Sequence, residues 1–190
     1  MSMSDKVLPP AFVKGAHIIL TPLNSDHVDL YFFWQNDVDI RTYFGNSIPK
    51  SKASIQELVL KTDLSMINFE IWYIEDKKPI GMAKISGINW IRRKCSIGGL
   101  IGDKSYWGQG LATELTQLLV DYIFGELNLN KIAALIYSPN IGSIKCAERL
   151  GFKLEAKVGD AGYFNGEYCE DLYYSLYQKD WKEKRKKMRK

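Results

Sequence analysis

The sequence predicts a single mixed α/β domain, in which an antiparallel half is followed by one β-α-β unit. Three observations favour this class. Residues 108–126 carry apolar side chains at helical spacing, which predicts a long amphipathic helix. Residues 131–137 form a short apolar run typical of a buried central strand. Residues 69–101 contain apolar stretches separated by turn residues, which predicts a three-stranded meander.

The other elements follow from caps, turn residues and periodicity. A strand is expected at residues 17–23, and Ser25 is a suitable N-cap for a helix that runs to about Gln35. The further expected elements are a helix at 51–61, meander strands at 69–73, 80–90 and 95–101, a helix at 141–150 that Gly151 ends, and strands at 152–157 and 172–177.

The chain is expected to have three parts. Residues 1–15 look like a loose arm, residues 16–181 like one domain, and residues 182–190 like a basic tail. The tail has seven bases and one acid, which gives it +6, so the total of +4 leaves −2 for the rest of the chain. Such a tail is usually a solvated, frayed end, and contact with RNA or the ribosome is the less favoured alternative.

Composition indicates an ordinary soluble protein. The chain has 190 residues, of which 46% are hydrophobic and 25% charged. We see no membrane-spanning run and no signal peptide. Cys95, Cys146 and Cys169 lack metal-ligand spacing and are expected to be free thiols in a reducing compartment. We therefore expect a cytoplasmic protein without a catalytic metal.

A glycine-rich turn gives the clearest chemical signal. Residues 95–112 run from a strand through this turn into the long helix. A helix N-terminus offers unpaired N–H groups and a positive dipole end, and glycines let a phosphate approach the backbone closely. The spacing fits neither an NTPase loop nor a dinucleotide fingerprint. Taken alone, the pattern also fits a plain tight turn.

Two segments carry a resemblance to a known family. The run from Tyr106 to Glu114 resembles the acetyl-CoA pyrophosphate loop of GNAT acetyltransferases, in which Gly110 and Ala112 match fixed positions. Trp107 stands where Arg or Gln is usual, as it does in the branch of ribosomal-protein and spermidine acetyltransferases. Residues 140–152 are similar to the family's Asn-x-x-Ser/Ala…Leu-Gly-Phe segment. The two motifs occur in the family's order.

The resemblance covers residues 16–181 and implies the GNAT fold. That fold is a six- to seven-stranded mixed, mostly antiparallel sheet, splayed between strands 4 and 5 and flanked by about four helices. It also implies acetyl-CoA as cofactor and CoA as product. The cofactor-binding residues that it implies are Leu100, Ile101, Trp107, Gly108, Gln109, Gly110, Leu111, Ala112, Asn140 and Ser143.

By the same resemblance, the backbone N–H near Leu100 would stabilise the developing oxyanion. The Tyr that often protonates the thiolate is replaced by Ala147, and Ser143 is the substitute acid that we favour. The position of the family's usual glutamate base is Ser96. The base is Glu70, another carboxylate acting through water, or absent. The plainer alternatives are a solvent-facing Glu70 and a Ser143 that bonds only the backbone.

His17 and His27 precede the cofactor half of the domain, and we expect them to be surface or hydrogen-bonded residues. The resemblance implies a small-molecule or peptide amine as acceptor: a protein N-terminal amine, a polyamine or an amino sugar. The acids of segment 160–171 would attract such a cation. A homodimer stays open, and no membrane partner is expected. The alternative function is a non-catalytic acetyl-CoA sensor or scaffold.

Overall fold

The computed structural model describes residues 7–44, 47–61 and 63–188. Its sheet has eight strands in the order β1-β2-β3-β4-β5-β6-β8-β7. The strands are β1 (Val13–Lys14), β2 (Ile18–Thr21), β3 (Met66–Tyr73), β4 (Lys78–Asn89), β5 (Lys94–Ile101), β6 (Lys131–Tyr137), β7 (Lys153–Phe164) and β8 (Glu167–Tyr177). The helices are η1 (Ser25–His27), α1 (Val28–Asn36), α2 (Val38–Phe44), α3 (Lys52–Leu60), η2 (Lys104–Tyr106), α4 (Leu111–Gly125), α5 (Ile141–Leu150) and α6 (Gln178–Met188).

This architecture confirms the predicted mixed α/β class, with a small difference in strand number. The extra strand, β1, comes from the segment expected to be a loose arm. Val13 pairs with Leu20 of β2, and the N–H of Phe12 donates to the carbonyl of Leu20 at 2.9 Å. The arm prediction was therefore wrong for this part, and its residues 1–6 lie outside the described residues.

The chain divides into two compact units, which we describe separately. Of the described residues, the N-terminal unit comprises 7–44, 47–61, 63, 67–84 and 99–118. The C-terminal unit comprises 64–66, 85–98 and 119–188.

Helix α1 organises the core of the N-terminal unit. Tyr31 and Trp34 on its inner face pack with Met82 and Leu100 from the sheet, and Tyr31 is fully buried. The helix is preceded by η1, whose N-cap is Asn24 rather than the expected Ser25. Large aromatic side chains bury much apolar area per residue, so α1 is held mainly by packing.

Helix α2 was not predicted. It is short, and its start is fixed by Asp37, whose Oδ1 accepts hydrogen bonds from the N–H groups of Asp39 and Ile40 at 3.0 and 3.3 Å. An acceptor side chain before the first turn is the usual N-cap signal. In α3, which was predicted at residues 51–61, Ser51 is the N-cap and its hydroxyl accepts from the N–H of Ser54 at 3.1 Å.

In the C-terminal unit, β6 pairs with its two neighbours to very different extents. All seven residues of β6 pair with β8 in antiparallel register, from Lys131↔Tyr177 to Tyr137↔Asp171. The parallel pairing with β5 covers only Lys94↔Lys131 to Ser96↔Ala133. The remainder of β6 is therefore unpaired on the β5 side. This matches the splay expected between the fourth and fifth predicted strands, which are β5 and β6 here.

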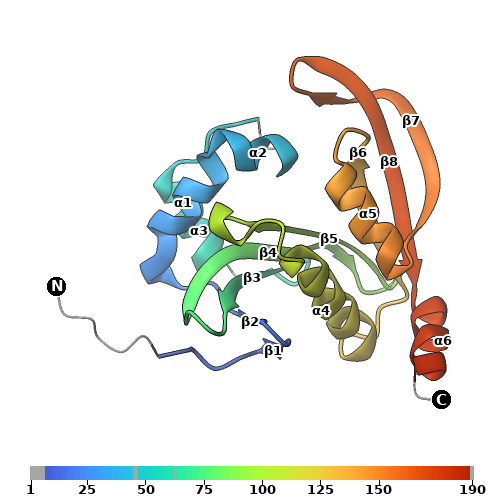
Figure 1. Ribbon diagram of the computed structural model, residues 1–190, viewed down its shortest axis with the longest axis horizontal. Helices are drawn as coiled ribbons and strands as arrows, with labels where there is room; N and C mark the ends of the chain where they lie inside the picture. The colour runs from blue at the N-terminus through green and yellow to red at the C-terminus, as the bar shows by residue number, and fades with distance from the viewer. Residues whose placement is uncertain (1–6, 45–46, 62, 189–190) are drawn as a thin grey trace. The chain divides into compact units, whose positions relative to one another are not determined.

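Strands β7 and β8 form a hairpin much longer than the sequence predicted (Figure 1). The expected strands at 152–157 and 172–177 are its base only. Asn165 and Gly166 make the turn with φ values of 50° and 91°. Asn-Gly is the strongest short signal for a hairpin turn, because both residues tolerate positive φ. That signal was present in the sequence.

The basic end of the chain also differs from expectation. Residues 178–188 form α6 rather than a frayed tail, and residues 189–190 lie outside the described part. The indole N–H of Trp181 donates to Asp121 of α4 at 2.6 Å, and the Arg185 guanidinium stacks 4.9 Å from the Trp181 ring. These contacts supply the tertiary support that a short charged helix needs.

The three cysteines form no disulfide, as predicted, and Cys95 is buried. Burial raises the pKa of the Cys95 thiol to about 12. Across the described ranges, no helix is long and apolar enough to cross a membrane.

Candidate active site

The turn between β5 and α4 is fixed to the start of β4. The N–H groups of Gly102 and Asp103 both donate to the carbonyl of Ile80, at 2.7 and 3.0 Å. Asp103 then caps η2 by accepting from the N–H and hydroxyl of Ser105. Its second oxygen lies 2.9 Å from the Lys78 ammonium. Burial would raise the pKa of Asp103, but the hydrogen bonds from Ser105 and Lys78 outweigh it and lower that pKa.

Two side chains of the predicted cofactor loop brace the loop itself. The indole N–H of Trp107 donates to the carbonyl of Ile101 at 2.7 Å, and the Gln109 amide donates to the carbonyl of Ser105 at 3.0 Å. Both bonds tie the loop to the chain just before it. The side-chain N–H groups of Trp107 and Gln109 are therefore already bonded to the protein, so a ligand would bind the loop backbone instead.

The loop backbone is shaped by two glycines. Gly108 and Gly110 have φ values of 77° and 81°, which L side chains rarely adopt, and no other atom lies within 4 Å of where a Cβ would stand. Within the described residues, the N–H groups of positions 108–111 make no hydrogen bond. Open backbone and consecutive free N–H groups fit a pyrophosphate. The loop thus suits the anionic part of acetyl-CoA.

The first turn of α4 is anchored by Glu114. Its carboxylate accepts from the His17 N–H at 2.8 Å, from His17 Nδ1 at 2.9 Å and from the Ile18 N–H at 3.3 Å. Burial would raise the pKa of Glu114, but the His17 and Ile18 hydrogen bonds outweigh it and lower that pKa. His17 is thus hydrogen-bonded, as expected. The contact fixes the helix whose N-terminus carries the loop.

Leu100 and Ile101 lie at the end of β5. The Leu100 side chain is buried in the core cluster around α1, so a ligand would meet the backbone of Leu100 rather than its side chain. Gly81 of β4 lies so close to the Leu100 carbonyl that any Cβ there would overlap it. A glycine at position 81 is therefore required for this end of the sheet to form.

Asn140 and Ser143 belong to the C-terminal unit, whereas the glycine loop belongs to the N-terminal unit. The Asn140 side-chain oxygen caps α5 by accepting from the Ser143 N–H at 3.1 Å. No described residue bonds the Asn140 side-chain amide nitrogen or the Ser143 hydroxyl, and Ser143 is half-buried. The cap is therefore real, and both residues keep a polar group for a ligand.

The positions of the family's usual acid and base hold residues that cannot replace them. Ala147, where the Tyr is common, is buried on the inner side of α5. Ser96, where the Glu is common, is half-buried in β5 and pairs with Ala133. Ser143 carries the only side-chain hydroxyl of α5, so it is the candidate acid on this helix.

Glu70 is not the solvent-facing residue that the plainer interpretation expected. It is 1% exposed and accepts from His27 Nδ1 at 2.7 Å, from the Tyr31 hydroxyl at 2.9 Å and from the Trp72 indole at 2.6 Å. Burial, together with the Glu70 charge, raises the pKa of Tyr31. A carboxylate saturated by donors inside the core cannot reach a substrate directly.

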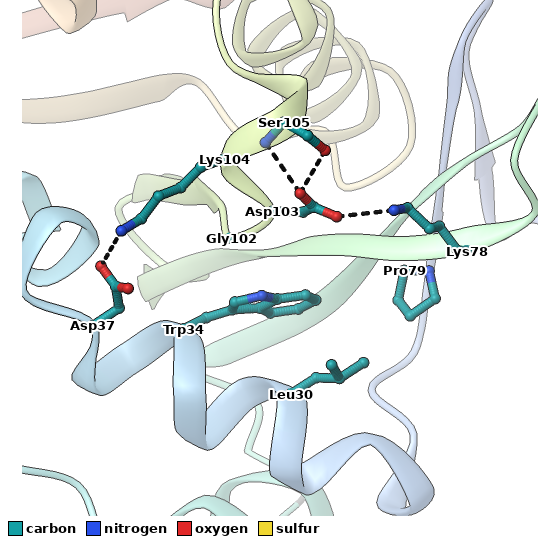
Figure 2. A pocket seen from close by; sticks show the side chains of 9 residues that line it. All are labelled: Leu30, Trp34, Asp37, Lys78, Pro79, Gly102, Asp103, Lys104 and Ser105. Atoms are coloured by element: carbon teal, nitrogen blue, oxygen red, sulfur yellow. Dashed lines mark hydrogen bonds and ion pairs between the residues drawn. The ribbon is translucent and has the colours of Figure 1, made fainter.

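A shallow pocket of about 550 Å³ lies beside α1 in the N-terminal unit (Figure 2). The Trp34 ring forms its floor and packs directly against Gly102. Its charged groups already have partners: Lys78 bonds Asp103, and Lys104 bonds Asp37 at 2.9 Å. Because these charges are paired, the pocket offers a ligand little free charge. None of the predicted site residues lines it.

Comparison with known proteins decides the family. Residues 17–153 match the model of the acetyltransferase (GNAT) domain. The chain belongs to the GNAT acetyltransferase family. It is 32% identical over 150 residues to the putative ribosomal N-acetyltransferase YdaF of Bacillus subtilis, covering 79% of this chain and 77% of that protein. It is 29% identical to the spermidine N(1)-acetyltransferase of Escherichia coli, over 54% of this chain and 55% of that protein.

Solved structures agree on the GNAT fold. The spermidine N-acetyltransferase of Vibrio cholerae, in complex with CoA and spermine, has a TM-score of 0.81 at 24% identity, covering 87% of this chain and 98% of that one. A probable acetyltransferase has a TM-score of 0.75 at 28% identity, covering 88% and 96%.

Membership of the GNAT family confirms the predicted enzyme class. The chain is an acyl-CoA-dependent N-acetyltransferase, and acetyl-CoA is the donor that GNAT acetyltransferases use. The free N–H groups of positions 108–111 match that donor chemically. Asp171, one of the acids expected in segment 160–171 to attract a cation, is a buried carboxylate on β8, and its burial was not predicted. The Asn165-Gly166 turn, which implies a longer hairpin, is the signal that would have placed this residue in a sheet.

Proposed function

We propose that this chain transfers the acetyl group of acetyl-CoA to a primary amine of a small cationic acceptor, with polyamines as the first candidate class. The observation that carries the proposal is the set of free N–H groups at positions 108–111, in a chain of this family. The amine nitrogen bonds to the acetyl carbon, the carbon–sulfur bond breaks, and the amine proton ends on the CoA thiol.

We assign each residue a role from the backbone or side-chain group that it offers to acetyl-CoA. The N–H groups of the loop from Trp107 to Ala112 hold the pyrophosphate, and the Asn140 amide orients the pantetheine. Backbone at Leu100 and Ile101 binds the thioester end, where an N–H stabilises the oxygen that gains charge. The Ser143 hydroxyl donates the proton to the leaving sulfur.

The base is the least defined part of the proposal. Glu70 bonds His27 Nδ1 at 2.7 Å, so a contribution from Glu70 would pass through the imidazole, as an orienting carboxylate does for a histidine base. His27 is 23% exposed, and no described residue bonds its Nε2. Glu70 is accordingly a positioning residue in this proposal.

The charge of the β7–β8 hairpin supports a cationic acceptor. Segment 160–171 contains four carboxylates, Asp160, Glu167, Glu170 and Asp171, and no lysine or arginine. Single-sign charge raises the local concentration of an opposite-sign substrate. A second candidate acceptor, a protein N-terminal amine, is supported by the similarity to the putative ribosomal N-acetyltransferase.

The test is a free-thiol assay of acetyl-CoA turnover with three acceptors: spermidine, a peptide with a free N-terminal serine, and glucosamine. We expect the highest kcat/KM for spermidine. Highest activity on the peptide would favour the second candidate. If acetyl-CoA binds and no amine releases CoA, the chain is a sensor or scaffold rather than an enzyme.

A further inference from the structure

Asp171 on β8 is a buried carboxylate without a partner. Its residue is 7% exposed, and its Oδ1 is buried with no hydrogen bond. No described residue forms an ion pair with it. Glu70 is more buried still but accepts three hydrogen bonds. Buried carboxylates are nearly always hydrogen-bonded or paired, because an uncompensated charge is costly away from water.

Glycine at position 162 of β7 lets Asp171 pack closely against the opposite strand. A Cβ at Gly162 would lie 2.7 Å from Asp171 Oδ1, 2.8 Å from Cys169 Sγ and 2.9 Å from Tyr137 Cδ1. The carboxylate and the edge of the Tyr137 ring therefore lie side by side over this glycine. Lys157 of β7, which stands opposite Leu172, lies 3.9 Å from the exposed Glu170 instead. The site thus combines a carboxylate and an aromatic edge, and no Lys or Arg of the described residues pairs with the carboxylate.

The strand opposite Asp171 is irregular at this point. Val158 pairs with Asp171 and Gly162 with Cys169, so residues 159–161 stand opposite Glu170 alone. Asp160 within this bulge has φ of 52°. Bulges re-aim side chains and occur often beside active sites. The irregularity is an observation independent of the missing hydrogen bond.

Asp171 of β8 lies beside the last residue of β6, just before the chain enters α5. It pairs with Tyr137, the last residue of β6, and the Ser138 N–H donates to the Glu170 carbonyl at 3.0 Å. The Asn140 N–H donates to the Tyr137 carbonyl at 2.8 Å. Within the C-terminal unit, the carboxylate therefore lies a few residues from Asn140, where α5 starts.

We propose that Asp171 binds a protonated, non-reacting ammonium group of the acetyl acceptor, which makes the enzyme selective for di- and polyamines over monoamines. This inference rests on the proposed function. An ammonium group supplies hydrogen-bond donors and a positive charge to the unpaired Asp171 carboxylate. The Tyr137 ring adds an aromatic surface that attracts cations. The reacting amine must be uncharged to attack, so the charged group is a second amine of the same molecule.

The test compares Asp171→Asn with Glu183→Gln, which makes the same charge change on an exposed residue of α6. Spermidine and butylamine are the acceptors. In Asp171→Asn we expect the KM for spermidine to rise about tenfold or more, because a charged hydrogen bond is lost. The KM for butylamine, the kcat and the thermal shift given by acetyl-CoA should not change. Glu183→Gln should behave as the wild type.

Stability gives a second readout with an unusual sign. Asp171→Asn should melt at the same or a higher temperature than the wild type, because it removes an unpaired buried charge. A clear fall in melting temperature would mean that the carboxylate is structurally paired and would overturn the proposal. An unchanged KM for spermidine would overturn it equally.

A failure of the proposed function is distinguishable from a failure of this inference. If the wild type turns over no amine, spermidine is added to the protein saturated with CoA and its thermal shift is measured. A shift in the wild type that Asp171→Asn loses supports the Asp171 site. No shift, or equal shifts in both proteins, overturns it.

Discussion

His27 Nδ1 lies 2.7 Å from Oε1 of Glu70, whose side chain is 1% exposed. The pair joins the last residue of η1 to the middle of β3. Tyr31, on the same side of the core, donates to the same oxygen and accepts from the N–H of Asn24 at 3.0 Å. A buried network with every donor satisfied fixes the position of α1 on the sheet.

Removing the charge of Glu70 should therefore destabilise the fold. Glu70→Gln leaves a buried donor without its acceptor, and we expect a loss of about 1–3 kcal/mol in the free energy of unfolding. Urea unfolding measures it, and Glu75→Gln, in the exposed turn after β3, is the control. Equal stability of the two variants would contradict the structural role of Glu70.

The glycine loop predicts a sharp contrast between two alanine variants. Gly110→Ala and Gly166→Ala both place a side chain at positive φ in open space, so each should cost about 1 kcal/mol of stability. Only Gly110→Ala should also weaken acetyl-CoA binding, because it alone covers the free N–H groups. Isothermal titration with acetyl-CoA measures this. Equal affinity in both variants would show that the loop does not bind the cofactor.

Ser143→Ala tests the proposed acid. The hydroxyl has no described partner, so its removal should leave the fold and the affinity for acetyl-CoA nearly intact. Turnover should fall on the order of a hundredfold if the hydroxyl protonates the leaving thiolate. Steady-state CoA release at saturating acetyl-CoA measures it. Unchanged turnover would remove Ser143 from the mechanism.

Glu114 predicts a pH dependence of stability. Its pKa is lowered in the folded state, so its contribution is present above the unfolded pKa of about 4.5 and is lost as the pH falls through the folded pKa. Glu114→Gln should be about 1–2 kcal/mol less stable than the wild type at pH 7, and the difference should shrink below pH 4.5. Urea titrations at pH 7 and pH 3.5 measure it. A constant difference would contradict the assignment.

The elements that the sequence predicted well have strong local signals. Strand β6 was placed at its exact bounds by its short apolar run, and α5 by the Asn140 cap and by Gly151, whose φ is 96°. The loop before α4 was predicted from its glycines, and Gly108 and Gly110 both adopt positive φ values that favour glycine. In each case, the local conformation is set by residues within or next to the element.

The missed features depend on contacts between residues distant in sequence. Nothing near Glu70 predicts that His27 and Tyr31, about forty residues earlier, will bury it. Helix α6 exists because Trp181 reaches Asp121, which overrides the charge repulsion within its basic run. The burial of Asp171 without a hydrogen bond to Oδ1 depends on how β6, β7 and β8 pair, which the residues next to it in sequence do not indicate.

The most direct test of the central claim is a thermal shift of the full chain with acetyl-CoA, with ATP and NAD as controls. The loop at positions 108–111 should bind acetyl-CoA in preference to both. At about 100 times Kd, binding to the folded state alone adds about 2.7 kcal/mol, which gives a clear rise in melting temperature. A rise with acetyl-CoA alone is the expected result. No rise, or an equal rise with ATP or NAD, would contradict the claim that this loop is an acetyl-CoA site.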